Sequence, residues 1–200
     1  MIRAIVWDYG GVLELSPLEL MAEVSKLLRV TREELGEVYF RYNHLANAHN
    51  MPWGEMFAKV VAQFDDSAET QSKVTALIAL VTKEKVLNAP LIEYIRTLKT
   101  RGYKLGVLSN YSDGLRGRLA QQGILDLFDT VVVSGEVGMQ KPSPEIFAHT
   151  ASKIGVEVSE MLFVDDTKKS LSTASEIGYA PVLFENTEQC IVDVETALIA

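Results

Sequence analysis

Two patterns of hydrophobic positions alternate along most of this chain. Short apolar runs, typical of strands buried on both faces of a sheet, occur at 2–7, 104–108, 130–133, 161–164 and 181–184. Segments with helical periodicity lie between or after the later runs, at 90–101, 113–122, 143–155, 169–178 and from 187 to the end. This alternation predicts an α/β fold in which a parallel sheet has helices on both faces.

Residues 17–85 break the alternation. They contain helical patterns at 17–28, 31–45, 53–64 and 68–82, but no convincing strand. Thr31 and Glu34 have the spacing of a capping box at the start of one of these helices. We therefore predict an all-helical cap domain at 17–85, inserted after the first strand of a core domain formed by 1–16 and 86–200.

The composition narrows the classes of function. The chain has 200 residues, of which 48% are hydrophobic, and a formal net charge of −8. A core of useful size is expected, whereas binding to nucleic acid is not, because an acidic surface repels phosphate backbones. No apolar run reaches the length of a membrane span, and Cys190 is the only cysteine. These features predict a cytoplasmic protein without a disulfide or a membrane segment.

The first strand ends in a candidate nucleophile. In open parallel sheets, ligands bind beyond the carboxyl ends of the strands. Asp8 stands there, followed by Gly10 and Gly11, which allow a tight turn and the close approach of a ligand. An aspartate so placed can attack phosphorus and form an acyl phosphate. The same residues would also suit a simple turn or helix cap.

Two further strand ends carry groups that could bind a phosphoryl group. The hydroxyl of Ser109 and the amide of Asn110 could hold its oxygens, although such a pair also caps helices. Lys141 lies between a strand and a helix and could neutralise negative charge, or it could be an exposed loop lysine. Ser143 is more simply the N-cap of the helix that begins at Pro144.

Asp165 and Asp166 directly follow the fourth apolar run. Adjacent carboxylates repel each other unless a cation compensates them. Oxygen ligands beside a phosphate site suit Mg²⁺, which takes one or two protein carboxylates and keeps several waters. The alternative is a helix start, where acids interact favourably with the helix dipole.

Taken in order, these four elements resemble the motifs of the haloacid dehalogenase-like (HAD-like) hydrolase superfamily, subfamily I, which has a helical cap after the first motif. Asp8 matches the nucleophile, Ser109 the second motif, Lys141 the third, and Asp165 with Asp166 the fourth. The stretch 134–142 is most similar to the branch of small sugar-phosphate phosphatases.

The resemblance implies a Rossmann-like core and a Mg²⁺ ion held by Asp8, Asp165, Asp166 and the carbonyl of Gly10. It also implies that catalysis depends on Asp8 and Lys141. The residues expected to bind the substrate phosphate are Tyr9, Gly10, Gly11, Ser109, Asn110 and Lys141. The expected activity is hydrolysis of a small phosphorylated metabolite, a phosphate monoester such as a sugar phosphate, through an aspartyl-phosphate intermediate on Asp8.

Gly10 departs from the family pattern. Phosphatases of the family usually have a second aspartate at this position as general acid and base, and its contribution is typically ~10²–10⁴-fold. Glycine has no side-chain proton to donate. Protonation of the leaving group must then come from water, from the substrate or from a residue of the cap.

Two other functions are compatible with the sequence. A 2-haloacid dehalogenase has a similar scaffold and uses aspartate to attack carbon without a metal, but it lacks paired acids like Asp165 and Asp166. A catalytically weak relative that binds a ligand or regulates a partner is the second alternative, supported by Gly10. The leaving group itself cannot be read from the sequence, because helix packing explains the polar cap residues equally well. These are Asn43, Asn47, Asn50 and Trp53, together with His44 and His49, whose spacing forms no metal motif.

Overall fold

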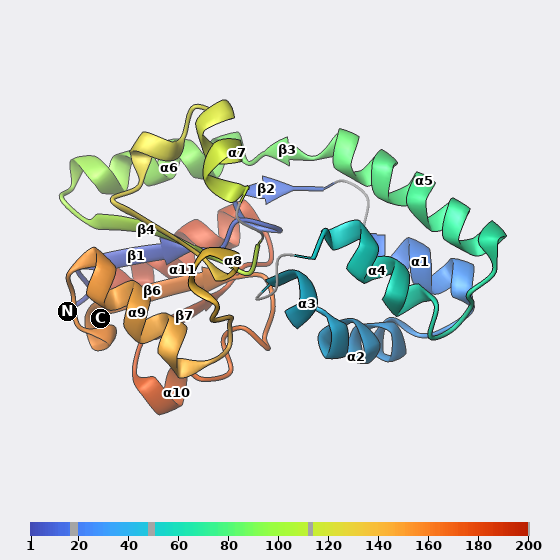
Figure 1. Cartoon of the computed structure of the whole chain (residues 1–200). Helices are drawn as coiled ribbons and strands as arrows, with labels where there is room; N and C mark the ends of the chain where they lie inside the picture. The colour runs from blue at the N-terminus through green and yellow to red at the C-terminus, as the bar shows by residue number, and fades with distance from the viewer. Residues whose placement is uncertain (17–19, 48–50, 112–113, 200) are drawn as a thin grey trace.

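A computed structural model describes residues 1–16, 20–47, 51–111 and 114–199 of the chain (Figure 1). Its centre is a five-stranded parallel sheet with the strand order β5-β4-β1-β6-β7. The strands are β1 (Ala4–Trp7), β4 (Lys104–Ser109), β5 (Thr130–Val133), β6 (Met161–Asp165) and β7 (Ala180–Leu183). The predicted parallel α/β sheet is confirmed, and each of the five apolar runs supplies one strand.

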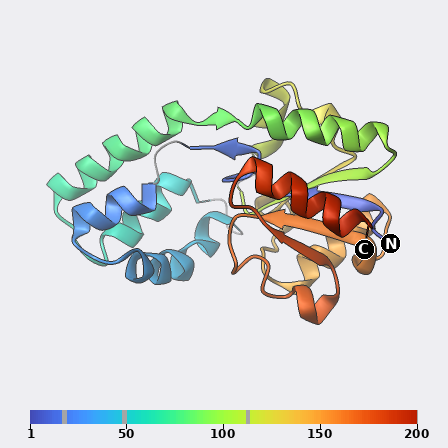
Figure 2. The same ribbon diagram turned by 180° about the vertical axis from the view of Figure 1, so that it is seen from behind.

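Helices cover both faces of this sheet, as the alternation of side chains along β1 requires. Ile5 and Trp7 are fully buried on one face, and Ala4 and Val6 on the other. The first face packs against helices seen in front of the sheet in Figure 2, namely α6 (Ala89–Thr100) and α11 (Thr187–Ile199), and against α7 (Leu115–Gln121). The second packs against α9 (Pro144–Ile154) and α10 (Ala174–Ile177).

The region predicted as all-helical lies beyond the end of the sheet toward which the β1 arrow points (Figure 1). We refer to its five helices together as the helical segment. It has a hydrophobic cluster of its own, and the capping box of Thr31 and Glu34 is confirmed by reciprocal hydrogen bonds of 3.1 and 2.8 Å. The helices are α1 (Leu20–Leu28), α2 (Arg32–Tyr42), α3 (His44–Asn47), α4 (Trp53–Val61) and α5 (Ala68–Glu84).

A small antiparallel sheet joins the helical segment to the large sheet. Its strands are β2 (Glu14–Leu15) and β3 (Val86–Leu87), which pair at the two points where the chain leaves and re-enters the core. Asn88 strengthens this junction, because its backbone N–H donates to Leu13 O at 2.8 Å and its side-chain amide to Val12 O at 3.1 Å. Strands of this length carry no detectable periodicity, so the sequence did not predict them.

Two predicted helices differ from those observed. The helix expected over 31–45 is divided at Asn43, a residue whose side chain competes for backbone hydrogen bonds. The helix expected over 169–178 is confined to α10, because residues 167–173 form successive turns rich in serine and threonine. A short helix, α8 (Ser134–Val137), was also not predicted.

The other predicted elements are observed, and their ends differ slightly from the predicted ends. Ser143 is the N-cap residue of α9, with Pro144 in its first turn. The first residues of the helices expected at 17–28 and 113–122 lie outside the described part of the chain. In the described ranges, no helix has the length and apolar character needed to cross a membrane.

Candidate active site

The candidate residues of four separate sequence segments meet at one edge of the sheet. Asp8 follows β1, which lies between β4 and β6, the strands that end in Ser109 and Asp165. Lys141 comes from the loop after α8. Because neighbouring parallel strands end together, residues about a hundred and more positions apart along the chain become neighbours in space.

Lys141 holds two carboxylates side by side. Its Nζ lies 3.0 Å from Asp8 Oδ1 and 2.5 Å from Asp165 Oδ2, and all three residues are buried. Burial alone would lower the pKa of the Lys141 ammonium, but the charges of Asp8 and Asp165 raise the pKa overall. The lysine is therefore kept charged between its two partners.

The negative charge of the buried Asp8 carboxylate is nevertheless only partly compensated. Loss of hydration raises its pKa to about 6, against the lowering effect of Lys141 and of a hydrogen bond with Ser109. Asp165 adds to the increase through its negative charge. The free-energy cost of burying this carboxylate thus exceeds the stabilisation that Lys141 and Ser109 provide.

Asp166 completes a cluster of three acids. One carboxylate oxygen from each of Asp8, Asp165 and Asp166 lies within 4.8 Å of the others. Asp166 is exposed to solvent, yet partial loss of hydration and the charges of Asp8 and Asp165 raise its pKa to about 7. Since its side chain is accessible, we assign more of this effect to the neighbouring charges than to burial.

Asn110 positions Lys141 through its backbone. The Asn110 side-chain amide donates to Lys141 O at 3.0 Å, and its carbonyl oxygen accepts from Lys141 N–H at 2.8 Å. Phe163 supports the lysine side chain from another direction, with Nζ 5.1 Å from the ring centroid. Sequence reasoning considered Asn110 only as a phosphate ligand or cap, because nothing along the chain indicates this pairing over 31 positions.

Thr167 fixes Asp165 and was also missed. Both its backbone N–H and its hydroxyl donate to Asp165 Oδ1, at 2.8 and 2.7 Å. This leaves the other oxygen, Oδ2, directed at Lys141. A hydroxyl residue two positions after an aspartate is the signal that could have predicted the turn.

The loop after Asp8 has one glycine that the site requires and one that it does not. Gly11 has φ +81°, and a Cβ there would collide with the Asp166 carboxylate. A Cβ at Gly10 would meet nothing within 4 Å. The Tyr9 N–H donates to Asp8 Oδ1 at 2.7 Å, and the Gly11 N–H to Glu14 O at 2.9 Å.

The polar residues of the helical segment differ from one another in burial and in contacts. Asn43 is buried, His44 contacts Arg41 O at 3.0 Å, and Trp53 is 37% exposed with its indole N–H 3.5 Å from the Tyr39 oxygen. The side chain of Asn47 and the residues His49 and Asn50 lie outside the described part of the chain.

Comparison with known proteins identifies the class. A sequence profile of the haloacid dehalogenase-like hydrolase family matches residues 2–178. The chain belongs to this family, and the expectation of a HAD-like fold with a Rossmann-like parallel sheet is confirmed.

Among characterised proteins, a glyceraldehyde 3-phosphate phosphatase of Methanopyrus kandleri is 34% identical over an alignment of 197 positions, which covers 91% of this chain and 83% of that protein. Bifunctional epoxide hydrolase 2 of Sus scrofa is 25% identical over 97% of this chain. The chain spans only 38% of the length of that larger enzyme.

Solved structures share the fold at lower identity. A HAD-like family hydrolase from Porphyromonas gingivalis has a TM-score of 0.66 and 22% identity, with 100% of this chain and 99% of that chain covered. An L-2-haloacid dehalogenase has the same TM-score and coverage at 17% identity. A HAD family enzyme from Bacteroides thetaiotaomicron, in complex with magnesium and inorganic phosphate, has a TM-score of 0.60 at 19% identity, covering 92% and 94%.

Proposed function

We propose that this protein is a Mg²⁺-dependent phosphatase that hydrolyses a small organic phosphate monoester. One observation carries the proposal: three carboxylates, from Asp8, Asp165 and Asp166, converge within 4.8 Å and face a single lysine, Lys141. Two negative charges are thus left without a partner among the described residues. A divalent cation is the ligand that such a surplus favours.

The donor set fits Mg²⁺. Asp8, Asp165, Asp166 and the Gly10 carbonyl supply only hard oxygen ligands, and the exposed carboxylate of Asp166 leaves the site open to water. When bound, the ion would supply positive charge between the nucleophile and the substrate phosphate, and so reduce their repulsion. The relative crystallised with magnesium and phosphate supports this choice of metal.

Asp8 carries the reaction in two steps. Its carboxylate attacks phosphorus, the bond from phosphorus to the ester oxygen breaks, and an aspartyl phosphate forms. Water then attacks the same phosphorus, releases inorganic phosphate and regenerates the carboxylate. Lys141 neutralises charge on the phosphoryl oxygens during both steps.

The remaining oxygens of the phosphoryl group are assigned to neutral donors. Ser109 and Asn110 lie at the end of β4, and the backbone N–H groups of Tyr9, Gly10 and Gly11 line the loop after Asp8. The Gly11 N–H already donates to Glu14 O and the Tyr9 N–H to Asp8 Oδ1, so Gly10 contributes most of this cradle. Asn110 acts in addition by holding the Lys141 backbone.

We further propose the division into a core of 1–16 and 86–200 and a cap of 17–85. The separate hydrophobic cluster of the helical segment and its attachment through β2 and β3 support this division. A cap over the strand ends would favour a small phosphorylated metabolite over a polymer. The similarity to a glyceraldehyde 3-phosphate phosphatase supports a phosphorylated sugar or a similar compound.

Hydrolysis of p-nitrophenyl phosphate tests the proposal. The purified protein should be active with Mg²⁺ and inactive after exhaustive chelation, and Asp166→Ala should lose most of this activity. Asp66→Ala, at an exposed acid between α4 and α5, serves as the matched control. Metal-independent release of chloride from a 2-chloro acid would instead establish the dehalogenase. Binding of phosphate esters without turnover would establish the ligand-binding protein.

A further inference from the structure

Gly10 leaves the proposed reaction without an evident proton donor. In-line attack by Asp8 directs the departing ester oxygen away from the nucleophile, toward the side of the site that faces the helical segment. Lys141 is engaged by two carboxylates, and Asp165 is fixed by Thr167. Asp166 would bind the proposed metal, so we expect the donor on the elements that lie opposite Asp8.

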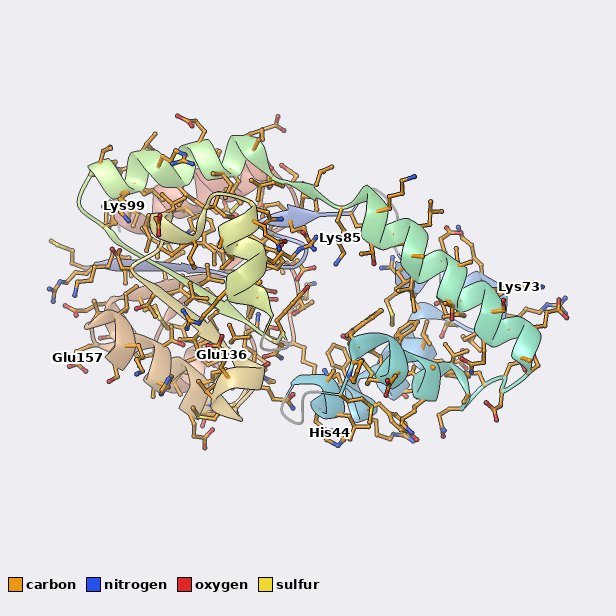
Figure 3. All side chains as sticks on the ribbon, turned by 45° about the horizontal axis from the view of Figure 1, so that its top comes forward. His44, Lys73, Lys85, Lys99, Glu136 and Glu157 are labelled. Atoms are coloured by element: carbon orange, nitrogen blue, oxygen red, sulfur yellow. The ribbon has the colours of Figure 1, made fainter. Side chains whose placement is uncertain are left out.

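The C-terminal half of α2 lies against the active-site loops. The ring of Phe40 is covered by Lys169, whose Nζ is 3.7 Å from the ring centroid, and Lys169 belongs to the turns that follow Asp166. The next helix, α3, contacts α8 of the core. Figure 3 shows the first residue of α3, His44, on the side of the helical segment nearest the core.

Tyr39 precedes Phe40 in this contact region. Its half-buried ring packs edge-on against Phe57, with the centroids 6.2 Å apart. Its oxygen accepts the indole N–H of Trp53 at 3.5 Å. An indole nitrogen can only donate, so the phenol keeps its own hydrogen to donate elsewhere, and the described residues provide no acceptor for it.

The electrostatic surroundings of Tyr39 agree with this position. Burial raises the pKa of the phenol, and the negative charges of Asp8 and Asp166 raise it further, although the Trp53 hydrogen bond opposes them. The phenol thus lies in the field of the nucleophile and of a metal-binding acid. It holds its proton at neutral pH.

We propose that Tyr39 is the catalytic acid and base that the chain has in place of an aspartate at position 10. This inference rests on the proposed phosphatase function. As the bond from phosphorus to the ester oxygen breaks, Tyr39 O–H donates its proton to that oxygen, and the products are a free alcohol, the aspartyl phosphate and a tyrosinate. In the second step the tyrosinate accepts a proton from the attacking water, which restores the phenol and releases phosphate.

The assignment also defines the substrate class. Alkoxide leaving groups need a proton, whereas aryl oxides depart readily without one. A phenol placed for this purpose indicates an alkyl ester, such as the phosphate of a primary alcohol in a sugar or polyol. The aromatic side chains beside it, Trp53 and Phe40, are 37% and 39% exposed and could contact the carbon skeleton of such an alcohol.

Tyr39→Phe separates the two kinds of leaving group. We expect kcat/KM for glycerol phosphate to fall ~10²–10³-fold, and kcat/KM for p-nitrophenyl phosphate to change by less than ~10-fold. Tyr42→Phe, the same substitution on the same helix, is the matched control and should leave both values near wild type. Equal losses for both substrates, or no loss for either, would overturn the assignment of Tyr39.

The open space at Gly10 provides a test by rescue. Since a Cβ at this position meets nothing within 4 Å, Gly10→Asp can be added to Tyr39→Phe. We expect at least ~10-fold recovery of kcat/KM with glycerol phosphate, because a carboxyl group can carry the missing proton. Recovery is not expected if the tyrosine serves only to hold the fold, so its absence would count against the proposal. Wild-type protein that hydrolyses neither ester in Mg²⁺ would reject the phosphatase function itself.

Discussion

Two charged clusters are built around buried acids that are close together along the chain, Glu14 and Asp8, and their negative charge is compensated very differently. The first surrounds Glu14 in β2, whose side chain is 1% exposed and forms ion pairs with Arg118 and with Lys85, the latter at 3.5 Å. Tyr9 O–H donates to the same carboxylate at 2.7 Å. One negative charge there meets two positive charges, whereas in the active site three carboxylates meet one lysine.

The pKa values of the two clusters shift in opposite directions. Burial alone would raise the pKa of Glu14, but the hydrogen bonds of Tyr9 and Arg118 and the charges of Lys85 and Arg118 lower it. Burial raises the pKa of Asp8 to about 6. Similar burial therefore has different consequences, and the number of nearby cations decides which. The Glu14 cluster therefore needs no further cation, while the three carboxylates of the candidate active site would be compensated by the proposed one.

The positions of the two clusters suit these roles. Glu14 lies in the junction sheet, and Lys85 lies where α5 returns to it, as Figure 3 shows. Arg118 reaches Glu14 from α7 of the core. The compensated cluster thus anchors both connections of the helical segment and the loop that begins at Asp8. We infer that it holds the geometry within which the uncompensated cluster binds its ligands.

The largest expected effect comes from Asp8→Asn. The amide is nearly isosteric but a poor nucleophile, and it is also a weaker metal ligand. We expect kcat/KM for p-nitrophenyl phosphate to fall by ~10⁴-fold or more. Turnover near that of wild type in a carefully purified variant would remove Asp8 from the mechanism.

Glu14→Gln should have the next largest effect, on stability. Removing this charge leaves Arg118 and Lys85 without their common partner. Because their side chains are 33% and 31% exposed, we expect a loss of about 2–3 kcal/mol in the free energy of unfolding, below the ~3–5 kcal/mol typical of fully buried pairs. Denaturant titration measures this loss.

The control for this variant is Glu69→Gln, which removes an exposed ion pair with Lys73 on α5. Exposed pairs contribute little, so no measurable change in the free energy of unfolding is expected. Equal effects of the two substitutions would show that the Glu14 cluster does not anchor the junction.

In the same denaturant titration, Asp8→Asn should instead increase the free energy of unfolding. Its raised pKa means that the ionised carboxylate is less stable in the metal-free fold than in the unfolded chain. At pH 8 the neutral amide should therefore increase the free energy of unfolding by ~1–3 kcal/mol, following the shift from 3.8 to about 6. A destabilised variant under chelating conditions would show that Lys141 compensates Asp8 fully.

Parts of these two clusters could be predicted from the sequence and parts could not. The distance along the chain between interacting residues decides which. Asp8, Ser109 and Asp165 follow apolar runs, so the strand ends place them at one edge of the sheet. Asn110 pairs with Lys141 over 31 positions, and Arg118 with Glu14 over 104. Pairings of this kind depend on tertiary packing, and no local pattern encodes them.

Tyr39 illustrates the same limit in the helical segment. Its helix was predicted, including the capping box at Thr31. The side of that helix which meets the core is set by tertiary packing, such as the contact between Phe40 and Lys169, and no local pattern encodes it. Helical periodicity indicated that 17–85 packs as helices, but not which side chains face the core.

The smallest expected effect is a dependence of the metal-free stability on pH. For Asp8 the folded-state pKa is about 6 and the reference value is 3.8, so between these values the folded protein binds more protons than the unfolded chain. The free energy of unfolding should therefore decrease as pH rises from about 4 to about 6, with a slope below ~1.4 kcal/mol per pH unit for this group. Asp166, with its pKa near 7, extends the decrease in the same direction. Glu14 contributes with the opposite sign, but its lowered pKa confines that contribution to more acidic solution.

Mg²⁺ should raise the melting temperature at pH 7.5 and have little effect at pH 5, because protons compete for the same oxygens. The difference between the melting curves of wild type and of Asp8→Asn isolates the contribution of the carboxylate. An identical Mg²⁺ shift at both pH values would place the metal outside this cluster.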